Sequence, residues 1–288
     1  METILRSPSG KQTILSPRHP VAMIGERINP SGGRRAQLAA ALAAGDMTLV
    51  REEALRQAAA GAAVIDVNVQ AGEVRDEAAT LVAAVQAVAA AVDLPIAIDS
   101  NNGRALAEAL KVCPGRPIIN SVSGEEASLA RVLPLAAEHK AVVIGLAMDD
   151  EGIPATAEGR LAVAEKIVER AGSFGIPASD ILLDSLTLSV GADSAAAAVT
   201  LETIRLIRER LGLNLTLGAS NVSFGLPLRP QINVGFLFMA VAAGVNCPIV
   251  DPIKMRETIA IANLLTGRDR HSAKFLAYYR QVQKIAQS

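Results

Sequence analysis

The feature that most constrains this sequence is a recurring short apolar run that ends in an acid or an amide. An uninterrupted apolar run of this length is typical of a parallel strand that is covered on both faces. The polar residue then marks the point where the strand leaves the core. The runs end at Asn29, Asp66, Asp99, Asn120, Asp184 and Asn221.

The runs alternate with Ala-rich helical segments. The pattern predicts strands near 21–25, 63–67, 95–99, 117–120, 141–146, 180–184, 214–219 and 247–250. It predicts helices near 47–60, 76–91, 103–112, 125–138, 157–174, 194–211, 231–243 and 254–265. Eight such alternations predict an α/β protein, a (β/α)8 TIM barrel whose polar strand ends converge at one rim. A doubly wound open sheet more often stops at about five or six strands, and no GxGxxG follows the first strand.

The chain length fits one barrel with extensions. It has 288 residues, a little above the roughly 250 that are typical of such a barrel. We therefore expect a single barrel domain over 21–266 and an N-terminal extension over 1–20 that forms a small hairpin or strap. Apolar residues at helical spacing predict an extra amphipathic helix within the C-terminal segment 267–288. The exposed face of this helix suggests a homodimer contact.

Composition argues against several classes of partner. The 28 Lys and Arg balance 29 Asp and Glu, and five Phe and two Tyr with no Trp provide no stacking platform for nucleic acid. The first twenty residues lack the apolar run of about 7–15 residues of a secretory signal. The most apolar later stretch, 234–245, is shorter than the about 18 residues that span a membrane. We expect a cytoplasmic protein without a nucleic-acid or membrane partner.

The predicted rim has few metal ligands. None of the three histidines ends a strand, so a His-based triad or a three-histidine zinc site is not indicated. Cys113 and Cys247 belong to no CxxC pattern, and a free cysteine is usually a small buried hydrophobe. The remaining candidate ligands are carboxylates, and hard cations favour denser oxygen clusters than this mixture of acids and amides. We expect no metal, although four carboxylates stay candidates: Asp66, Asp99, Asp184 and Asp251.

Acids and amides at strand ends suit a planar heterocycle. A carboxylate accepts two parallel N–H bonds from an aminopyrimidine edge, and an amide both donates and accepts. A pterin has such an edge. Each residue taken alone is as well explained as a cap of the helix that follows its strand. Several at once favour a ligand.

Seven segments carry a resemblance to a known family. They are IGERIN (24–29), DVNV (66–69), AIDSNN (97–102), IINSVSGE (118–125), IGLAMDDEGIP (144–154), LLDSL (182–186) and GASNVSFGLPLRPQIN (218–233). From about residue 21 to 265 the chain resembles the pterin-binding methyltransferases, most of all the methyltetrahydrofolate:corrinoid protein methyltransferases. It also resembles the folate domain of cobalamin-dependent methionine synthase. Dihydropteroate synthase is similar in fold but more distant in motif, and its SxRPG loop is not found.

The resemblance implies roles for individual residues. Asp99, Asn120 and Asp184 match residues that hydrogen-bond the pterin ring, and Asn221 matches a mobile amide that reaches N5. The positions that border the same pocket are Asn29, Asp66 and Asn68. Residues that resemble the pocket's floor and walls are Gly145, Met148, Gly218 and Ser220. Arg229 matches an arginine at the rim, near the corrinoid approach.

The implied activity is methyl transfer between N5 of tetrahydrofolate and the cobalt of a corrinoid (cobalamin) carried by a partner protein. Tetrahydrofolate or methyltetrahydrofolate is then the substrate, and the direction stays open. Three alternatives also stay open: a dihydropteroate synthase-like condensing enzyme, a non-catalytic folate-binding scaffold, and a barrel with unrelated rim chemistry.

Overall fold

The computed structural model describes residues 1–31 and 35–286. Within them, eight parallel strands form one sheet in the order β10-β3-β4-β5-β6-β7-β8-β9. Their bounds are β3 Ile24–Ile28, β4 Val64–Val67, β5 Ile96–Asp99, β6 Ile118–Ser123, β7 Val142–Leu146, β8 Ile181–Asp184, β9 Asn214–Thr216 and β10 Ile249–Val250. A parallel bridge from Gly218 to Ile249 joins the two ends of the sheet. The sheet therefore closes, and the predicted TIM barrel is confirmed.

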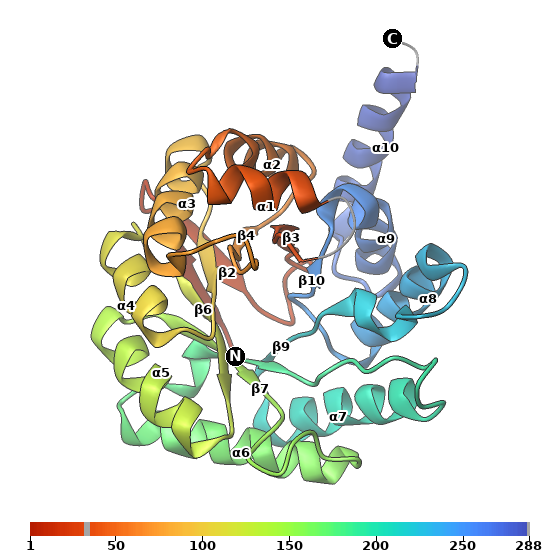
Figure 1. Cartoon of the computed structure of the whole chain (residues 1–288). Coiled ribbons are helices and arrows are strands. Elements are labelled where there is room, and N and C mark those ends of the chain that lie inside the picture. The colour runs from red at the N-terminus through yellow and green to blue at the C-terminus, as the bar shows by residue number, and fades with distance from the viewer. Residues whose placement is uncertain (32–34, 287–288) are drawn as a thin grey trace.

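Helices form a ring around the strands (Figure 1). Those that follow successive strands are α2 Thr48–Ala59, α3 Glu77–Ala91, α4 Gly103–Val112, α5 Glu126–His139, α6 Ala157–Ser173, α7 Ala196–Leu211, α8 Arg229–Ala243 and α9 Pro252–Leu265. α1 Ala36–Ala43 is an additional helix before α2 that the strand–helix alternation did not predict. Its sequence, AQLAAALA, consists of strong helix formers.

Strand alternation divides the side chains into two layers. On β4, Ile65 and Val67 point outward and belong to the large core between the strands and the helices. Val64 points inward, into a smaller cluster inside the barrel. This inner cluster contains Ile24, Val64, Ala97, Ile118, Val142, Ile144, Leu182 and Cys247. The base of the barrel interior is therefore apolar.

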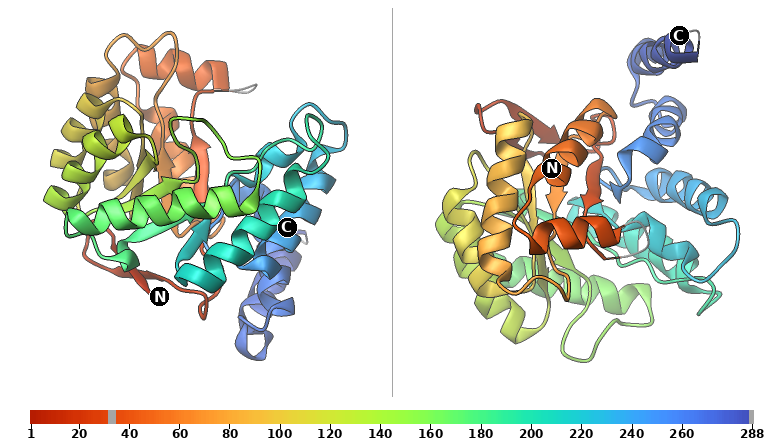
Figure 2. Two further views of the ribbon diagram at one scale, coloured as in Figure 1. Left: turned by 90° about the horizontal axis from the view of Figure 1, so that it is seen from below. Right: turned by 45° about the horizontal axis from the view of Figure 1, so that its top comes forward.

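The N-terminal extension closes this base. It forms an antiparallel hairpin of β1 Thr3–Arg6 and β2 Gln12–Leu15, which lies across one end of the barrel (Figure 2). Leu5 and Leu15 are buried in the inner cluster. Asn214 Nδ2 at the start of β9 donates to Leu15 O at 3.0 Å and to Thr3 Oγ1 at 2.8 Å. The hairpin thus fills the lower opening and keeps water out of the apolar layer.

The C-terminal helix α10 Ala273–Ala286 extends away from the ring (Figures 1 and 2). The Arg256 guanidinium of α9 lies 5.6 Å from the centre of the Tyr278 ring, and Leu276 and Tyr279 are exposed. Residues 287–288 of the predicted C-terminal segment, and 32–34 of the barrel segment, lie outside the described residues. A homodimer through this helix stays a prediction. No helix within the described ranges has the length and apolar character needed to cross a membrane.

Because Leu15 seals the base, Leu15→Ala should lower the free energy of unfolding by about 2–5 kcal/mol, the usual cost of a cavity in a core. The matched control is Leu55→Ala, since Leu55 is 53% exposed on α2 and such a surface change costs about 0.5 kcal/mol or less. Urea unfolding of both variants measures the difference. Equal losses would mean that the hairpin does not seal the barrel.

Candidate active site

The upper half of the barrel interior is polar, and the strand period explains why. Side chains two positions apart in a strand point to the same side. On five strands, an apolar residue of the inner layer is followed two positions later by an acid or amide, which therefore also points inward. The pairs are Ile24 and Glu26, Val64 and Asp66, Ala97 and Asp99, Ile118 and Asn120, and Leu182 and Asp184.

Two amide–carboxylate hydrogen bonds join three neighbouring strands. Asn120 Nδ2 on β6 donates to Asp66 Oδ1 on β4 at 3.0 Å. Asn68 Nδ2, just after β4, donates to Asp99 Oδ2 on β5 at 2.9 Å. Asp99 is also the register partner of Asn120. The structure therefore brings Asp66, Asn68, Asp99 and Asn120 together as predicted neighbours.

Asp184 faces this group from the other side of the ring, since β8 lies four strands from β4 in the sheet order. Its Oδ1 accepts a hydrogen bond from Leu186 N at 2.8 Å. The side chain is buried. The interior thus presents carboxylates from two sides of the barrel.

Burial dominates the electrostatics of the interior. It raises the pKa of Asp184 to about 7, against the opposing effects of the Leu186 N–H and Arg160. It raises the pKa of Glu26 to about 7 and that of Asp99 to about 6. The pKa of Asp66 lies well above its ordinary value because of burial and the nearby Asp99 and Glu26. Ionising these groups is costly without donors, so a ligand with several N–H groups would offset that cost.

Asn221 lies on the turn that follows β9, the 3-10 helix η3 Ala219–Ser223. Its side chain is exposed. A Cβ at position 218 would lie 3.0 Å from Asn221 Nδ2, so Gly218 leaves the space that the amide occupies. The amide therefore lies at the rim, close to Gly218, whereas the carboxylates lie on the strands of the barrel interior.

Arg229 at the start of α8 folds back onto this turn. Its Nε donates to Ser223 Oγ and its Nη2 donates to Ser220 O, both at 3.1 Å. The guanidinium lies 5.7 Å from the centre of the Phe224 ring. Arg229 is at the rim, as the resemblance implied, but its contacts brace the turn that carries Asn221.

Three other predicted residues make contacts outside the inner group. Asn29 Oδ1 accepts from Ser31 N at 3.0 Å and so caps its own loop. Met148 O accepts from Gly124 N at 2.7 Å and links the loops after β6 and β7. A Cβ on Gly145 would meet Leu183 Cδ2 at 3.0 Å and Ile167 Cγ2 of α6 at 3.1 Å. Gly145 therefore faces the helix layer, because Ile144 takes the inward position of β7.

Sequence reasoning missed Glu26 and Arg160. Glu26 follows inward-facing Ile24 by two positions, so strand period alone could have placed it inside. Arg160 falls on the apolar stripe of α6 and is only 2% exposed.

Asp251, one of the four candidate carboxylates for a metal, lies outside the barrel. It pairs with Arg27 Nη1 at 2.8 Å and caps α9.

Within residues 1–31 and 35–286, no group of three or more His, Cys, Asp or Glu side chains is arranged to hold a metal ion. Independence from metal stays a prediction.

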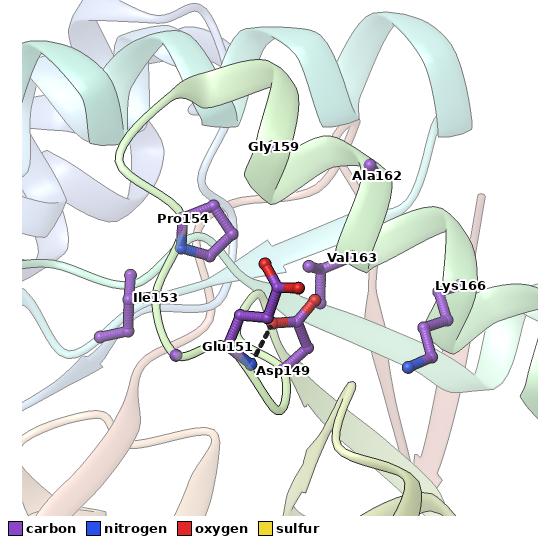
Figure 3. A pocket seen from close by; sticks show the side chains of 9 residues that line it. Asp149, Glu151, Ile153, Pro154, Gly159, Ala162, Val163 and Lys166 are labelled. Atoms are coloured by element: carbon purple, nitrogen blue, oxygen red, sulfur yellow. Dashed lines mark hydrogen bonds between the residues drawn. The ribbon is translucent and has the colours of Figure 1, made fainter.

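A pocket outside the barrel lies between the loop after β7 and the first turns of α6, beside Asp149, Pro154 and Lys166 (Figure 3). None of the inner acids lines it.

The chain is similar to several known proteins. The family model described as pterin binding enzyme matches residues 25–251. A methylcorrinoid:tetrahydrofolate methyltransferase of Eubacterium limosum is 30% identical over 265 residues, which cover 90% of this chain and 96% of that protein. A methionine synthase of Mycobacterium tuberculosis is 32% identical over 274 residues, 91% of this chain. This chain spans 22% of that longer protein.

Solved structures of dihydropteroate synthase share the fold. That of Yersinia pestis with a pterine-sulfa conjugate has a TM-score of 0.69 and 18% identity, and covers 93% of this chain and 100% of its own. That of Vibrio fischeri has a TM-score of 0.68 and 16% identity, and covers 92% and 98%. At these identities the likeness extends to the barrel alone.

The raised pKa of Asp184 predicts a pH-dependent stability. Folded protein holds a proton on Asp184 up to about pH 7, while the unfolded chain releases it near the ordinary value of 3.8. The free energy of unfolding therefore falls as pH rises from about 4 to about 7. Asp184→Asn removes this loss but keeps an oxygen acceptor for Leu186 N–H.

Ligand-free Asp184→Asn should be more stable than the parent at about pH 8 by up to about 4 kcal/mol, since the pKa rises from 3.8 to about 7 on folding and one pKa unit corresponds to about 1.4 kcal/mol. The gain should vanish near pH 4. Urea unfolding at both pH values measures it, with Glu209→Gln on the exposed face of α7 as the control. A gain that is the same at both pH values would contradict the assignment.

Proposed function

The chain belongs to the pterin binding enzyme family, and on that premise we propose that it is a methyltransferase acting between tetrahydrofolate and a corrinoid. In this proposal tetrahydrofolate binds at the mouth of the barrel. The methyl group moves between N5 of the folate and the cobalt of a corrinoid that a separate protein carries. The Eubacterium limosum relative, which this chain matches over nearly its whole length, bears the name of a methyltransferase that acts on a methylcorrinoid and tetrahydrofolate.

The observation that supports this proposal best is the set of inward acids and amides above an apolar floor. Asp99 and Asp184 lie on opposite walls of the barrel, and burial raises the pKa of both. A pterin carries ring N–H groups and an exocyclic amine on a flat apolar body. Its donors would stabilise the ionised carboxylates, and its body would rest on the inner layer.

The amides complement the acids. Asn120 donates to Asp66 and Asn68 donates to Asp99, so each amide holds a carboxylate at a fixed place before a ligand arrives. The carbonyl oxygen of Asn68 accepts from Gln70 N at 2.7 Å, and that of Asn120 is left as an acceptor for a ligand. We propose that Asp99, Asn120 and Asp184 bind the pterin ring, with Asp66 and Asn68 supporting them from below and beside.

The chemical difficulty lies at N5. When the bond between N5 and the methyl group breaks, its electron pair stays on N5, which leaves easily only if it also gains a proton from solvent. A donor that strengthens its hydrogen bond to N5 as charge develops accelerates this step. We assign that role to Asn221, because its amide is exposed at the rim and lies close to Gly218.

The corrinoid, when its carrier protein docks, supplies the cobalt that gives or accepts the methyl group. The residues of this chain bind and orient the folate and hold the N5 hydrogen bond. Arg229 braces the Ser220–Ser223 turn that carries Asn221. In this proposal, replacing Arg229 would therefore disturb Asn221 as well as any docking of the corrinoid protein. We propose a homodimer and a cytoplasmic location on the weaker grounds of the exposed α10 face and the composition.

A direct assay tests the function. The pure protein is mixed with methylcobalamin and tetrahydrofolate, and separately with cob(I)alamin and methyltetrahydrofolate. We expect the corrinoid spectrum to change in both mixtures. Folate binding without any exchange would instead identify a binding scaffold. Condensation of p-aminobenzoate with a pterin diphosphate would identify a dihydropteroate synthase-like enzyme.

Asn221→Ala should slow methyl transfer by about 10²–10³-fold, the usual cost of one donor that acts in the transition state. Tetrahydrofolate affinity should change much less. Asn221→Asp should also be slow, since a carboxylate offers no donor at neutral pH. Single-turnover rates at saturating folate and corrinoid measure the effect.

Asn101→Ala is the matched control for Asn221→Ala, because Asn101 is another exposed amide, on the loop after β5. Its rate should equal that of the parent. If Asn221→Ala also stayed within a few-fold of the parent, Asn221 would have no part in the chemical step.

A further inference from the structure

Arg160 is a charged side chain that is buried, whereas most arginines are exposed at the surface. It lies in α6 on the stripe that includes Leu161, Ala164 and Ile167, and it is among the largest fully buried side chains. A buried guanidinium costs free energy unless its donors are paired. The identity of its partners therefore indicates what the residue is for.

Its hydrogen bonds go to carbonyl groups of two rim loops. Nε donates to Pro154 O at 3.0 Å, and Pro154 belongs to the loop that packs over the start of α6 (Figure 3). Nη1 donates to Ser185 O at 2.9 Å and to Leu186 O at 2.8 Å. Nη1 also lies 3.4 Å from Thr200 Oγ1 of α7, and this hydroxyl lies 2.9 Å from both Leu186 O and Ala196 O, to one of which it donates its proton. One side chain thus ties the loop after β7 to the loop after β8.

The second loop begins at Asp184. Leu186 has a φ of 57°, a left-handed conformation that a leucine rarely adopts. In that conformation its N–H points back and donates to Asp184 Oδ1 at 2.8 Å. The carbonyl groups of Ser185 and Leu186 point the other way, toward Arg160. The guanidinium therefore holds the turn in the one form that orients the Asp184 carboxylate.

We infer that Arg160 is a positioning residue for Asp184, holding the turn over residues 184–186 and favouring the ionised carboxylate that folate binding requires. This inference rests on the proposed function, since it assigns the purpose of the turn to the folate site. The carboxylate must be ionised to accept both a ring N–H and an amine N–H of the pterin edge.

The charges near Asp184 support this reading. Arg160 of α6 opposes the effect of burial on the pKa of Asp184. Cys247, just before β10, is the other titratable group that faces Asp184; burial raises its thiol pKa first and Asp184 raises it further, so it is neutral. Glu26, Asp66 and Asp99 act mainly on one another on the opposite wall. Arg160 is therefore the cation that opposes the effect of burial on the pKa of Asp184, beside the larger opposing effect of the Leu186 N–H.

The test measures tetrahydrofolate affinity by titration calorimetry across about pH 5.5 to 9. In the parent protein, affinity should rise with pH through about 7 as Asp184 ionises. Arg160→Met keeps the length of the side chain and removes its charge. It should move the midpoint upward by about one pH unit, since a close opposite charge shifts a carboxyl pKa by about one unit or more. Affinity at pH 7 should fall about fivefold, because the ionised fraction of Asp184 falls from about a half to about one tenth.

Arg160→Lys should restore the midpoint but only part of the affinity, because one ammonium group cannot reach all the carbonyl oxygens. In an Asp184→Asn background, Arg160→Met should shift the midpoint no further. A merely structural arginine would lower stability without this coupling. Arg208→Met provides that comparison, since Arg208 of α7 donates to Leu213 O at the base of the barrel.

An unchanged midpoint in Arg160→Met, with folate still bound, would overturn the inference and leave the proposed function intact. If Arg160→Met does not fold, Arg160→Lys and Thr200→Val decide the matter. Arg160→Lys with a midpoint shifted upward as far as that expected of Arg160→Met would also overturn it, as would an unchanged affinity in both Arg160→Lys and Thr200→Val. A parent protein that binds no tetrahydrofolate would instead refute the proposed function.

Discussion

The interaction on which the rest of this structure depends is the burial of carboxylates inside an otherwise apolar barrel. Asp66 and Asp184 are almost fully buried. Their pKa values are raised because ionising a carboxyl group away from water costs free energy. Local devices limit this cost. On one wall, the amides of Asn120 and Asn68 donate to Asp66 and Asp99. On the other wall, the Leu186 N–H donates to Asp184, and the positive charge of Arg160 favours the ionised carboxylate.

The two ends of the barrel follow from the same constraint. At the base, the hairpin inserts Leu5 and Leu15 into the inner cluster and excludes water. At the mouth, water and ligand must enter, and the strands end in polar residues there. The lower layer gives a flat aromatic ligand an apolar surface, while the upper layer gives its N–H groups acceptors. A site that binds a pterin is thus a consequence of where the strand alternation changes from apolar to polar.

The strands and most of the inner acids and amides could be predicted from the sequence, because local patterns of apolar and polar residues determine them. Apolar runs defined all eight strands, and the polar residue at each end identified Asp66, Asp99, Asn120 and Asp184 as rim neighbours. What was missed depends on a second layer of contacts. Glu26 precedes the end of its run, so attention to run ends overlooked it. Gly145 was assigned to the pocket, but it faces α6 because its neighbour Ile144 takes the inward position. Arg160 acts through carbonyl groups in two distant loops, which no sequence spacing reveals.

The proposed site combines rigid and movable parts, and its chemistry needs both. The acids that would hold the ring lie on strands within the core, where packing fixes them. Asn221 lies instead on the turn after β9, where its own side chain is exposed while Ala219, Val222 and Ser223 are buried. Arg229 bonds to Ser220 O and Ser223 Oγ on either side of Asn221 and so braces the backbone of the turn. In the proposed mechanism the backbone stays in place and only the amide rotates. A donor of this kind can follow N5 as charge develops there, which a group fixed for the ground state could not do.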